Sequence, residues 1–143
     1  MSLENTDFPV RMPLRMDWSE MDLYDHINNV MILKYVQTAR VHYWDTVGIK
    51  TVPRQDHGPI LASTSCRFLR PLVYPGELQL LSRLSSLGNS SFGLQHRILD
   101  QHGQIAVEAH DLIVMYDYNS NKKIRVNDEI RTAMERLEGR LPG

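Results

Sequence analysis

Residues 28–48 read NNVMILKYVQTARVHYWDTVG, and this stretch decides the fold. Apolar side chains recur along it at helical spacing, while polar side chains fall on the opposite side. The apolar set is Ile32, Val36, Ala39, Tyr43 and Val47, and the polar set is Lys34, Gln37, Thr38, His42 and Asp45. Asn28 or Asn29 can cap the start and Gly48 the end. The pattern predicts a helix over residues 29–47, about five turns long and able to cross a sheet.

Strand patterns flank this helix on both sides. Residues 8–18 are short and extended in character, and Pro9 and Pro13 favour an edge strand there. Four further strand patterns follow the helix, separated by turn residues such as Gly88-Asn89. They cover residues 60–69, 77–87, 91–99 and 105–117. A polar turn at residues 119–123 precedes a short predicted helix at 127–139, which Asn127 or Asp128 can cap.

This element order predicts an α+β fold in which an antiparallel sheet wraps around one long central helix. The 143 residues suggest one domain spanning 1–143, with its core at about residues 8–138. One helix covers only one face of such a sheet. The uncovered face or edge therefore predicts self-association.

Composition excludes several classes of function. A formal net charge of −1 provides no basic field for nucleic acid, and no apolar run approaches the roughly 18 residues of a membrane span. The N-terminal residues lack the features of a secretion signal. The lone Cys66 fits a reducing, cytoplasmic location and is interpreted as a small buried hydrophobe. No phosphate loop, dinucleotide fingerprint or G-x-S-x-G turn is present, so no cofactor is expected.

The densest polar cluster, EMDLYDHINN at residues 20–29, directly precedes the long helix. Asp22, Asp25 and His26 are too few and too unspecific for a metal site, and His26 also fits a half-buried histidine bonded to a carbonyl. Asp22 sits too early to cap the helix. A carboxylate beside free helix-start amides can support hydrolysis of an activated ester. Thioesters suit such a site because their thiolate leaving group has a conjugate-acid pKa of about 8.5 and needs no strong general acid.

These residues resemble a family motif. The motif is typical of hotdog-fold acyl-CoA thioesterases of the 4-hydroxybenzoyl-CoA thioesterase class. It consists of an acid, a variable residue, a catalytic Asp, two residues and Gly-His-Val-Asn-Asn, and an aromatic-rich helix that ends near Ala-Arg follows it. Here the motif reads EMDLYDHINN, with Tyr35 and Ala39-Arg40 downstream. The resemblance continues through RFLRPLVYPGEL, SLGNSSFGLQHRILDQHGQIAVEA and VMYDYNSNKKIRV, and it covers roughly residues 10–135.

The resemblance implies hydrolysis of a small-molecule acyl-CoA substrate at a site between two subunits of a homodimer or homotetramer. Asp22 would be nucleophile or general base, amides at the start of the helix would polarise the carbonyl, and His26 and Asn29 would shape the site. The substrate-binding residues it implies are Tyr24, Val30, Arg67, Arg70 and Ser91.

Two departures from the family pattern affect these expectations. Asp25 replaces the family's glycine, so the turn or the local charge differs. Gly88-Asn89-Ser90 stands where some relatives carry a basic run that grips CoA phosphates, which leaves Arg67, Arg70, Lys122 and Lys123 as candidates. Two alternatives stay open: an acyl-carrier-protein thioesterase, and a non-catalytic domain that binds acyl thioesters. A hotdog dehydratase is disfavoured because its proline-rich loop is missing.

Overall fold

The computed structural model describes residues 2–142. Its strands are β1 (Val10–Arg15), β2 (His57–Phe68), β3 (Glu77–Leu87), β4 (Ser91–Leu99), β5 (Ile105–Asp117) and β6 (Lys122–Lys123). Its helices are α1 (Asn29–Val47) and α2 (Asp128–Glu138), and two short 3-10 turns precede α1, η1 (Asn5–Asp7) and η2 (Trp18–Glu20).

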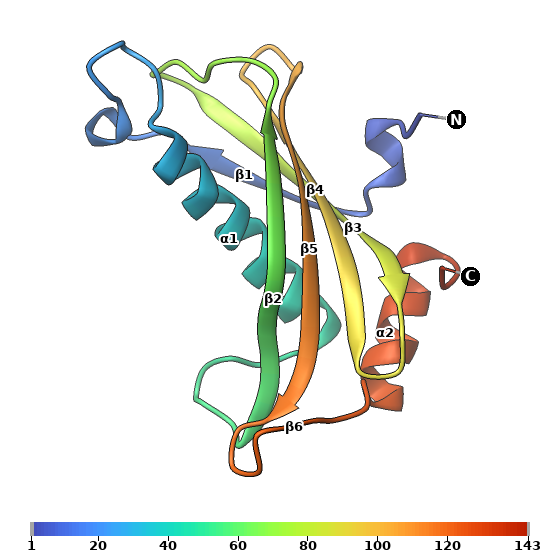
Figure 1. Ribbon diagram of the computed structural model, residues 1–143. Coiled ribbons are helices and arrows are strands. Elements are labelled where there is room, and N and C mark those ends of the chain that lie inside the picture. Colours follow the sequence, from blue (N-terminus) through green and yellow to red (C-terminus); the bar gives the residue numbers. More distant parts are fainter. Residues whose placement is uncertain (1, 143) are drawn as a thin grey trace.

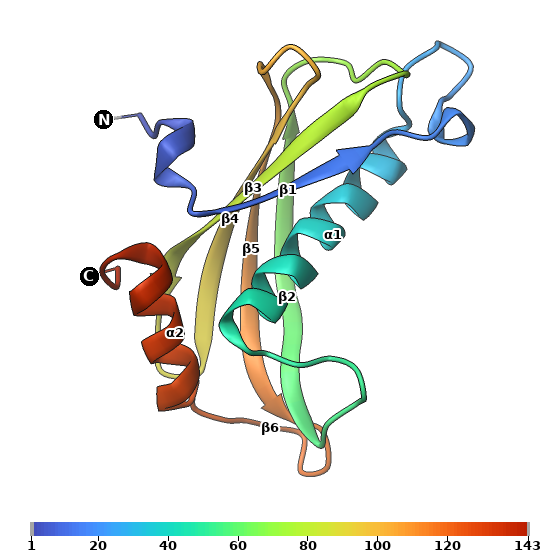
Figure 2. The same cartoon turned by 180° about the vertical axis from the view of Figure 1, so that it is seen from behind.

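The strands form one antiparallel sheet in the order β1-β3-β4-β5-β2, and β6 pairs with the end of β5. The sheet curls, and α1 lies across its inner face (Figure 1). From behind, β1 leads toward the start of α1, and α2 lies near the other end of α1, where it packs on α1 and β3 (Figure 2). This is the predicted α+β hotdog fold.

The bounds of α1 agree with the sequence prediction because both caps are strong. The Asn28 side chain accepts a hydrogen bond from the Val30 amide (2.8 Å), and Gly48 ends the helix in a left-handed conformation with φ of 88°. That conformation costs glycine little and other residues more. The predicted apolar stripe is buried, including Tyr43, which is fully inaccessible.

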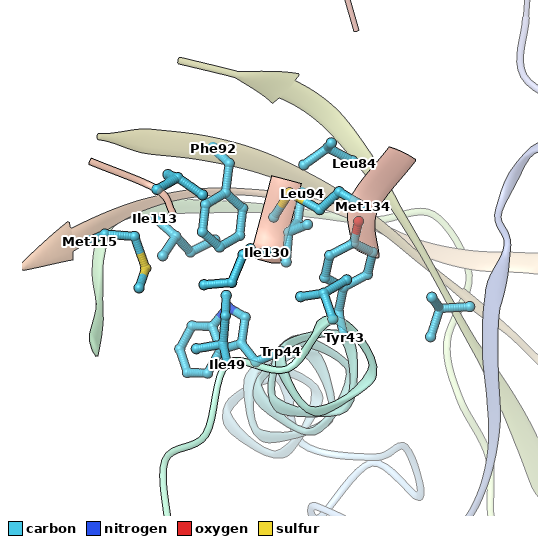
Figure 3. Packing of buried hydrophobic residues seen from close by; sticks show 13 residues of the cluster. Tyr43, Trp44, Ile49, Leu84, Phe92, Leu94, Ile113, Met115, Ile130 and Met134 are labelled. Carbon is cyan, nitrogen blue, oxygen red and sulfur yellow. The ribbon is translucent and has the colours of Figure 1, made fainter. Parts of the chain in front are cut away.

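Two apolar clusters join α1 to the sheet. One surrounds the start of the helix and includes Ile32, Val36 and Leu80. The other surrounds its end, where Tyr43 and Trp44 face Phe92 and Met134 (Figure 3). Trp44 and Tyr43 are therefore core residues. The clusters fix α1 along its whole length and so hold its N-terminus at a set position over the sheet.

Some elements differ from the sequence prediction. β2 begins at His57, three residues before the predicted start. The segment predicted as a polar turn also contains the two-residue strand β6. Asn121 in that turn has a φ of 58°, which lets the chain reverse tightly enough for Lys122 to pair with Asp117. Cys66 is only half-buried, not buried as predicted, because β2 lies at the edge of the sheet.

The edge strand β2 has only β5 as a neighbour, and most of its side chains are exposed. Ile60, Leu61 and Phe68 are among its exposed apolar residues. A long edge of this kind is a template for pairing with another strand. In the described part of the chain, no helix has the length and apolar character needed to cross a membrane.

Candidate active site

The polar cluster before α1 folds into a short, closely tied loop. Met21 and Ile27 form an isolated antiparallel bridge, and the Asp22 amide donates to the His26 carbonyl (2.7 Å). The Ile27 amide donates to the carbonyl of Leu72 (2.7 Å), in the connection between β2 and β3. The loop is thus fixed both to itself and to the far end of β2.

Asp22 presents one oriented and one unoccupied carboxylate oxygen. Its Oδ1 accepts hydrogen bonds from the amides of Tyr24 (2.8 Å) and His26 (3.4 Å). Its Oδ2 makes no hydrogen bond with residues 2–142, and the side chain is half-buried. Such a carboxylate is held in place while one oxygen stays available to attack a carbonyl or to take a proton from water.

Asp25, which replaces the family's glycine, adopts a left-handed conformation with φ of 63°. Its amide donates to the Asp22 carbonyl (3.3 Å), which closes the turn. Aspartate tolerates this region better than most residues with a Cβ. The backbone at Asp25 has the left-handed conformation that favours glycine. Of the two differences expected at this position, a changed turn or a changed local charge, the extra carboxylate is therefore the one present.

Glu20 ties the loop to α1. The Tyr35 hydroxyl donates to its carboxylate (2.5 Å), and its own carbonyl accepts from the Asn28 amide (2.9 Å). Burial raises the pKa of Tyr35, and the hydrogen bond to Glu20 raises it further, so this tyrosine remains a hydrogen-bond donor. The contacts hold the acid-bearing loop against the first turns of the helix.

The start of α1 offers amides that are free for a ligand. Asn28 already caps the Val30 N–H, whereas the Asn29 and Met31 N–H groups donate to no group in the described residues. Helix N-termini carry partial positive charge and favour anionic oxygens. Asn29 therefore contributes a backbone donor as well as its side chain.

A pocket of about 260 Å³ joins these groups. Asp22, His26 and Asn29, the three predicted catalytic residues, line one side of it, and Arg70 lies at its rim with the chain that follows β2. The remaining walls are mostly apolar: Ile27, Ile32, Phe68, Leu69, Pro71 and Leu72. Ligand pockets usually measure about 300–1,000 Å³, so the pocket of this chain lies just below the usual range.

Four of the predicted substrate-binding residues lie outside this pocket. Tyr24 and Val30 are exposed next to it. Arg67 pairs across strands with Glu108 on the outer face of the sheet, opposite the face that carries Phe68. Ser91 starts β4 and pairs with Val114, toward the opposite end of β5 from the Phe68–Val107 pair.

His26 is exposed, and its ring makes no hydrogen bond with residues 2–142. The alternative interpretation as a half-buried histidine bonded to a carbonyl is therefore wrong. Its backbone closes the loop and its side chain faces the pocket. In the described residues no group of three or more His, Cys, Asp or Glu side chains gathers as metal ligands.

Sequence reasoning missed a buried polar network beneath α1. Arg40 donates twice to the Asp111 carboxylate (2.8 and 3.1 Å), and Thr64 donates to it as well (2.7 Å). His96 bridges Asp111 and Ser82, with 2.7 Å on each side. Burial raises the pKa of Asp111, but the hydrogen bonds from His96, Arg40 and Thr64 outweigh it and hold that pKa well below its usual range. Arg40 on the apolar side of the helical repeat was the one available signal.

A curled antiparallel sheet around one helix, with an acid-bearing loop at the helix N-terminus, defines the hotdog-fold thioesterase class. The model of the thioesterase-like superfamily matches residues 16–134, and the chain belongs to this family.

Individual relatives are distant but similar over most of their length. The long-chain acyl-CoA thioesterase FadM of Escherichia coli is 25% identical over 122 residues, covering 82% of this chain and 90% of that protein. A Thermus thermophilus thioesterase solved with coenzyme A and Zn is 25% identical with a TM-score of 0.83, covering 94% and 97% of the two chains. A putative thioesterase of Pseudomonas aeruginosa is 29% identical with a TM-score of 0.81, covering 89% and 98%.

Proposed function

We propose that this protein hydrolyses acyl-CoA thioesters to a free acid and CoA. The observation that carries the proposal is the Asp22 carboxylate, whose Oδ1 is fixed by two backbone amides beside the free Asn29 N–H in a largely apolar pocket. The names of the E. coli and T. thermophilus relatives support the same substrate class.

The chemistry follows from the two kinds of group at the site. Asp22 Oδ2 takes a proton from water as the water oxygen attacks the carbonyl carbon, or it attacks that carbon itself to form an anhydride that water then opens. The Asn29 N–H and the helix dipole stabilise negative charge on the carbonyl oxygen. The C–S bond breaks and CoA leaves as a thiolate, which needs no strong acid.

The other pocket residues have supporting roles. The Asn29 side chain and the exposed His26 ring orient water or the acyl carbonyl, and their loss is expected to be less damaging than that of Asp22. Arg70 at the rim is suited to the anionic phosphates of CoA, since guanidinium groups bind phosphate through paired donors.

We further infer that the working unit is a dimer in which β2 pairs with β2 of a second copy. The pocket of a single chain is small, and the 12-residue strand β2 leaves one edge unpaired. Antiparallel pairing would place the partner's His57 end next to this chain's Phe68 end. It would also bring the end of the sheet that carries Ser91 of the partner subunit toward the pocket. Light scattering at micromolar concentration should give twice the 16.6 kDa chain mass or a multiple of it, and a pure monomer would contradict the shared site.

The test of catalysis compares Asp22→Asn with wild type for thiol release from a panel of acyl-CoAs. Asparagine keeps an oxygen for the Tyr24 and His26 amides, so the loop should hold, but it has neither a nucleophilic carboxylate nor a useful base. The expected loss is about a hundredfold or more in kcat, the scale of a removed general base, with acyl-CoA binding retained.

Asp25→Asn is the matched control. It removes the same charge three residues away, and asparagine also tolerates the left-handed conformation at this position. Its kcat should stay within a few-fold of wild type. Unchanged turnover in Asp22→Asn would refute the role of Asp22. Acyl-CoA binding without any thiol release by wild type would instead identify a binding domain.

A further inference from the structure

We propose that the acyl group lies along an apolar strip between α1 and β2. The Arg40–Asp111–Thr64 cluster ends this strip. The site therefore selects acyl chains of medium length, about eight to twelve carbons. The acyl strip consists of Leu33, Cys66 and Phe68. The inference rests on the proposed function and adds the substrate class to it.

The acyl strip is uncovered because of where α1 lies. The helix packs on β1, β3 and β4, and it does not pack closely on β2. Cys66 and Phe68 pair with the buried residues Ala109 and Val107, so their side chains share the inner face of the sheet. Phe68 is nevertheless 49% exposed and Leu33 on the helix is 43% exposed.

The strip starts at the reacting groups. Phe68 lines the same pocket as Asp22 and Asn29, so an acyl chain whose carbonyl sits at the helix N-terminus meets this ring first. Leu33 follows Asn29 by one helical turn, on the same flank of α1. Cys66 lies two residues before Phe68 and packs on the apolar cluster around Ile32 and Val36. A methylene chain in this direction exchanges water for apolar contacts.

The strip ends where a polar bridge crosses from helix to strand. Asp111 of β5 accepts from Arg40 of α1 and from Thr64 of β2, so the three residues span the space between the two elements. The Asp111 side chain is fully buried, and that of Arg40 is 7% exposed. These polar groups are already hydrogen-bonded to one another, and a hydrocarbon chain that displaced them could not replace their hydrogen bonds.

The spacing of these residues sets the length of chain that fits. Phe68 and Thr64 are four strand residues apart, roughly 13 Å, and Asn29 and Arg40 are eleven helical residues apart, roughly 16 Å. The Arg40 side chain leans back toward the start of the helix, which shortens the second path. At about 1.2 Å per bond in an extended chain, the strand path holds roughly eleven bonds, which lies within the proposed range of eight to twelve carbons.

The experiment measures kcat/KM for straight-chain acyl-CoAs from two to eighteen carbons with wild type, Cys66→Phe and Ser65→Phe. Wild type should peak near ten carbons and fall at least tenfold by sixteen. Cys66→Phe fills the middle of the strip and should lose at least tenfold with the ten-carbon substrate, while staying within threefold of wild type with the two-carbon substrate.

Ser65→Phe is the matched control, because it places the same ring on the adjacent residue of β2, which pairs with His110 on the outer face of the sheet. It should keep the wild-type length profile. Leu33→Trp changes an exposed residue on the helix side of the strip and should give the length profile expected for Cys66→Phe. It replaces Cys66→Phe in the experiment if Cys66→Phe folds poorly. A wild-type optimum at sixteen or more carbons would overturn the proposal, as would equal losses for two and ten carbons in both strip variants.

A failure of the proposed function gives a different result. If wild type releases no thiol from any substrate, the same panel is measured as binding affinity by calorimetry. Tighter binding of decanoyl-CoA than of acetyl-CoA, abolished by Cys66→Phe and kept by Ser65→Phe, would support the acyl strip although hydrolysis is absent. Equal affinities for both ligands would overturn it.

Discussion

Replacement of Asp111 by asparagine should destabilise this protein more than any other single isosteric change in its core. The carboxylate receives two hydrogen bonds from Arg40, one from Thr64 and one from His96, all from residues on different elements. Asparagine keeps one acceptor oxygen and places an NH₂ group where an oxygen stood. The Arg40 guanidinium then stays buried with no opposite charge.

The magnitude follows from burial. The side chains of Arg40 and Asp111 are 7% and 0% exposed, so solvent screens the pair little. Removal of one partner from a buried ion pair costs about 3–5 kcal/mol, mainly because the remaining charge is uncompensated. For a chain of this size each kcal/mol lowers Tm by roughly 2–4 °C, so the expected decrease is about 6–20 °C. Thr64→Val, which removes one neutral donor, should cost only about 1 kcal/mol.

The assay is urea unfolding of wild type, Asp111→Asn, Arg40→Met and the double variant at one fixed protein concentration, because the proposed dimer would make apparent stability depend on concentration. The double variant should be less damaged than the sum of the single variants, since it removes the orphaned charge together with its partner. A loss below about 1 kcal/mol for Asp111→Asn, or strict additivity in the cycle, would refute the view that this pair is a tightly coupled buried unit.

Two further predictions concern pH and the acid-bearing loop. The pKa of Asp111 is lowered in the folded protein, so the stability that its carboxylate contributes is fully present above the ordinary pKa of 3.8 and is lost as pH falls below that value. Wild type should therefore lose stability in acid, measured by circular dichroism, and Asp111→Asn should show a flatter dependence on pH. Asp25→Gly should stabilise the protein by up to about 1 kcal/mol, because φ of 63° is unfavourable for a residue with a Cβ; a melting curve shifted downward would contradict this account of the turn.

Local signals in the sequence were enough for the elements and for the acid-bearing loop. Asn28 and Gly48 fixed the bounds of α1 because both caps act through neighbouring backbone groups. The segments 77–87, 91–99 and 105–117 became β3, β4 and β5 with the predicted bounds. Asp22, His26 and Asn29 were predicted as one site and line one pocket, since they lie within eight residues on a short loop.

Contacts between distant residues could not be predicted from local sequence patterns. In the sequence Arg40 interrupts the apolar side of a helix and Asp111 interrupts a strand, and nothing local links them, although they form one ion pair across 71 residues. His96 occupies an inner-face position between Leu94 and Ile98, and only its contacts with Ser82 and Asp111 account for its burial. Arg67 and Ser91 were predicted near the substrate, but strand register places them away from the pocket of their own chain.

The sequence by itself therefore determined what depends on neighbours along the chain: the capped helix, the alternation of the strands and the motif that carries Asp22. The tertiary structure alone decided which helix-start amides are free, where the Arg40–Asp111–Thr64 bridge closes the space beside β2, and that β2 lies at an exposed edge. The physical reason is that caps and periodicity are energies of adjacent residues, whereas buried charge pairing and edge exposure depend on how distant segments meet.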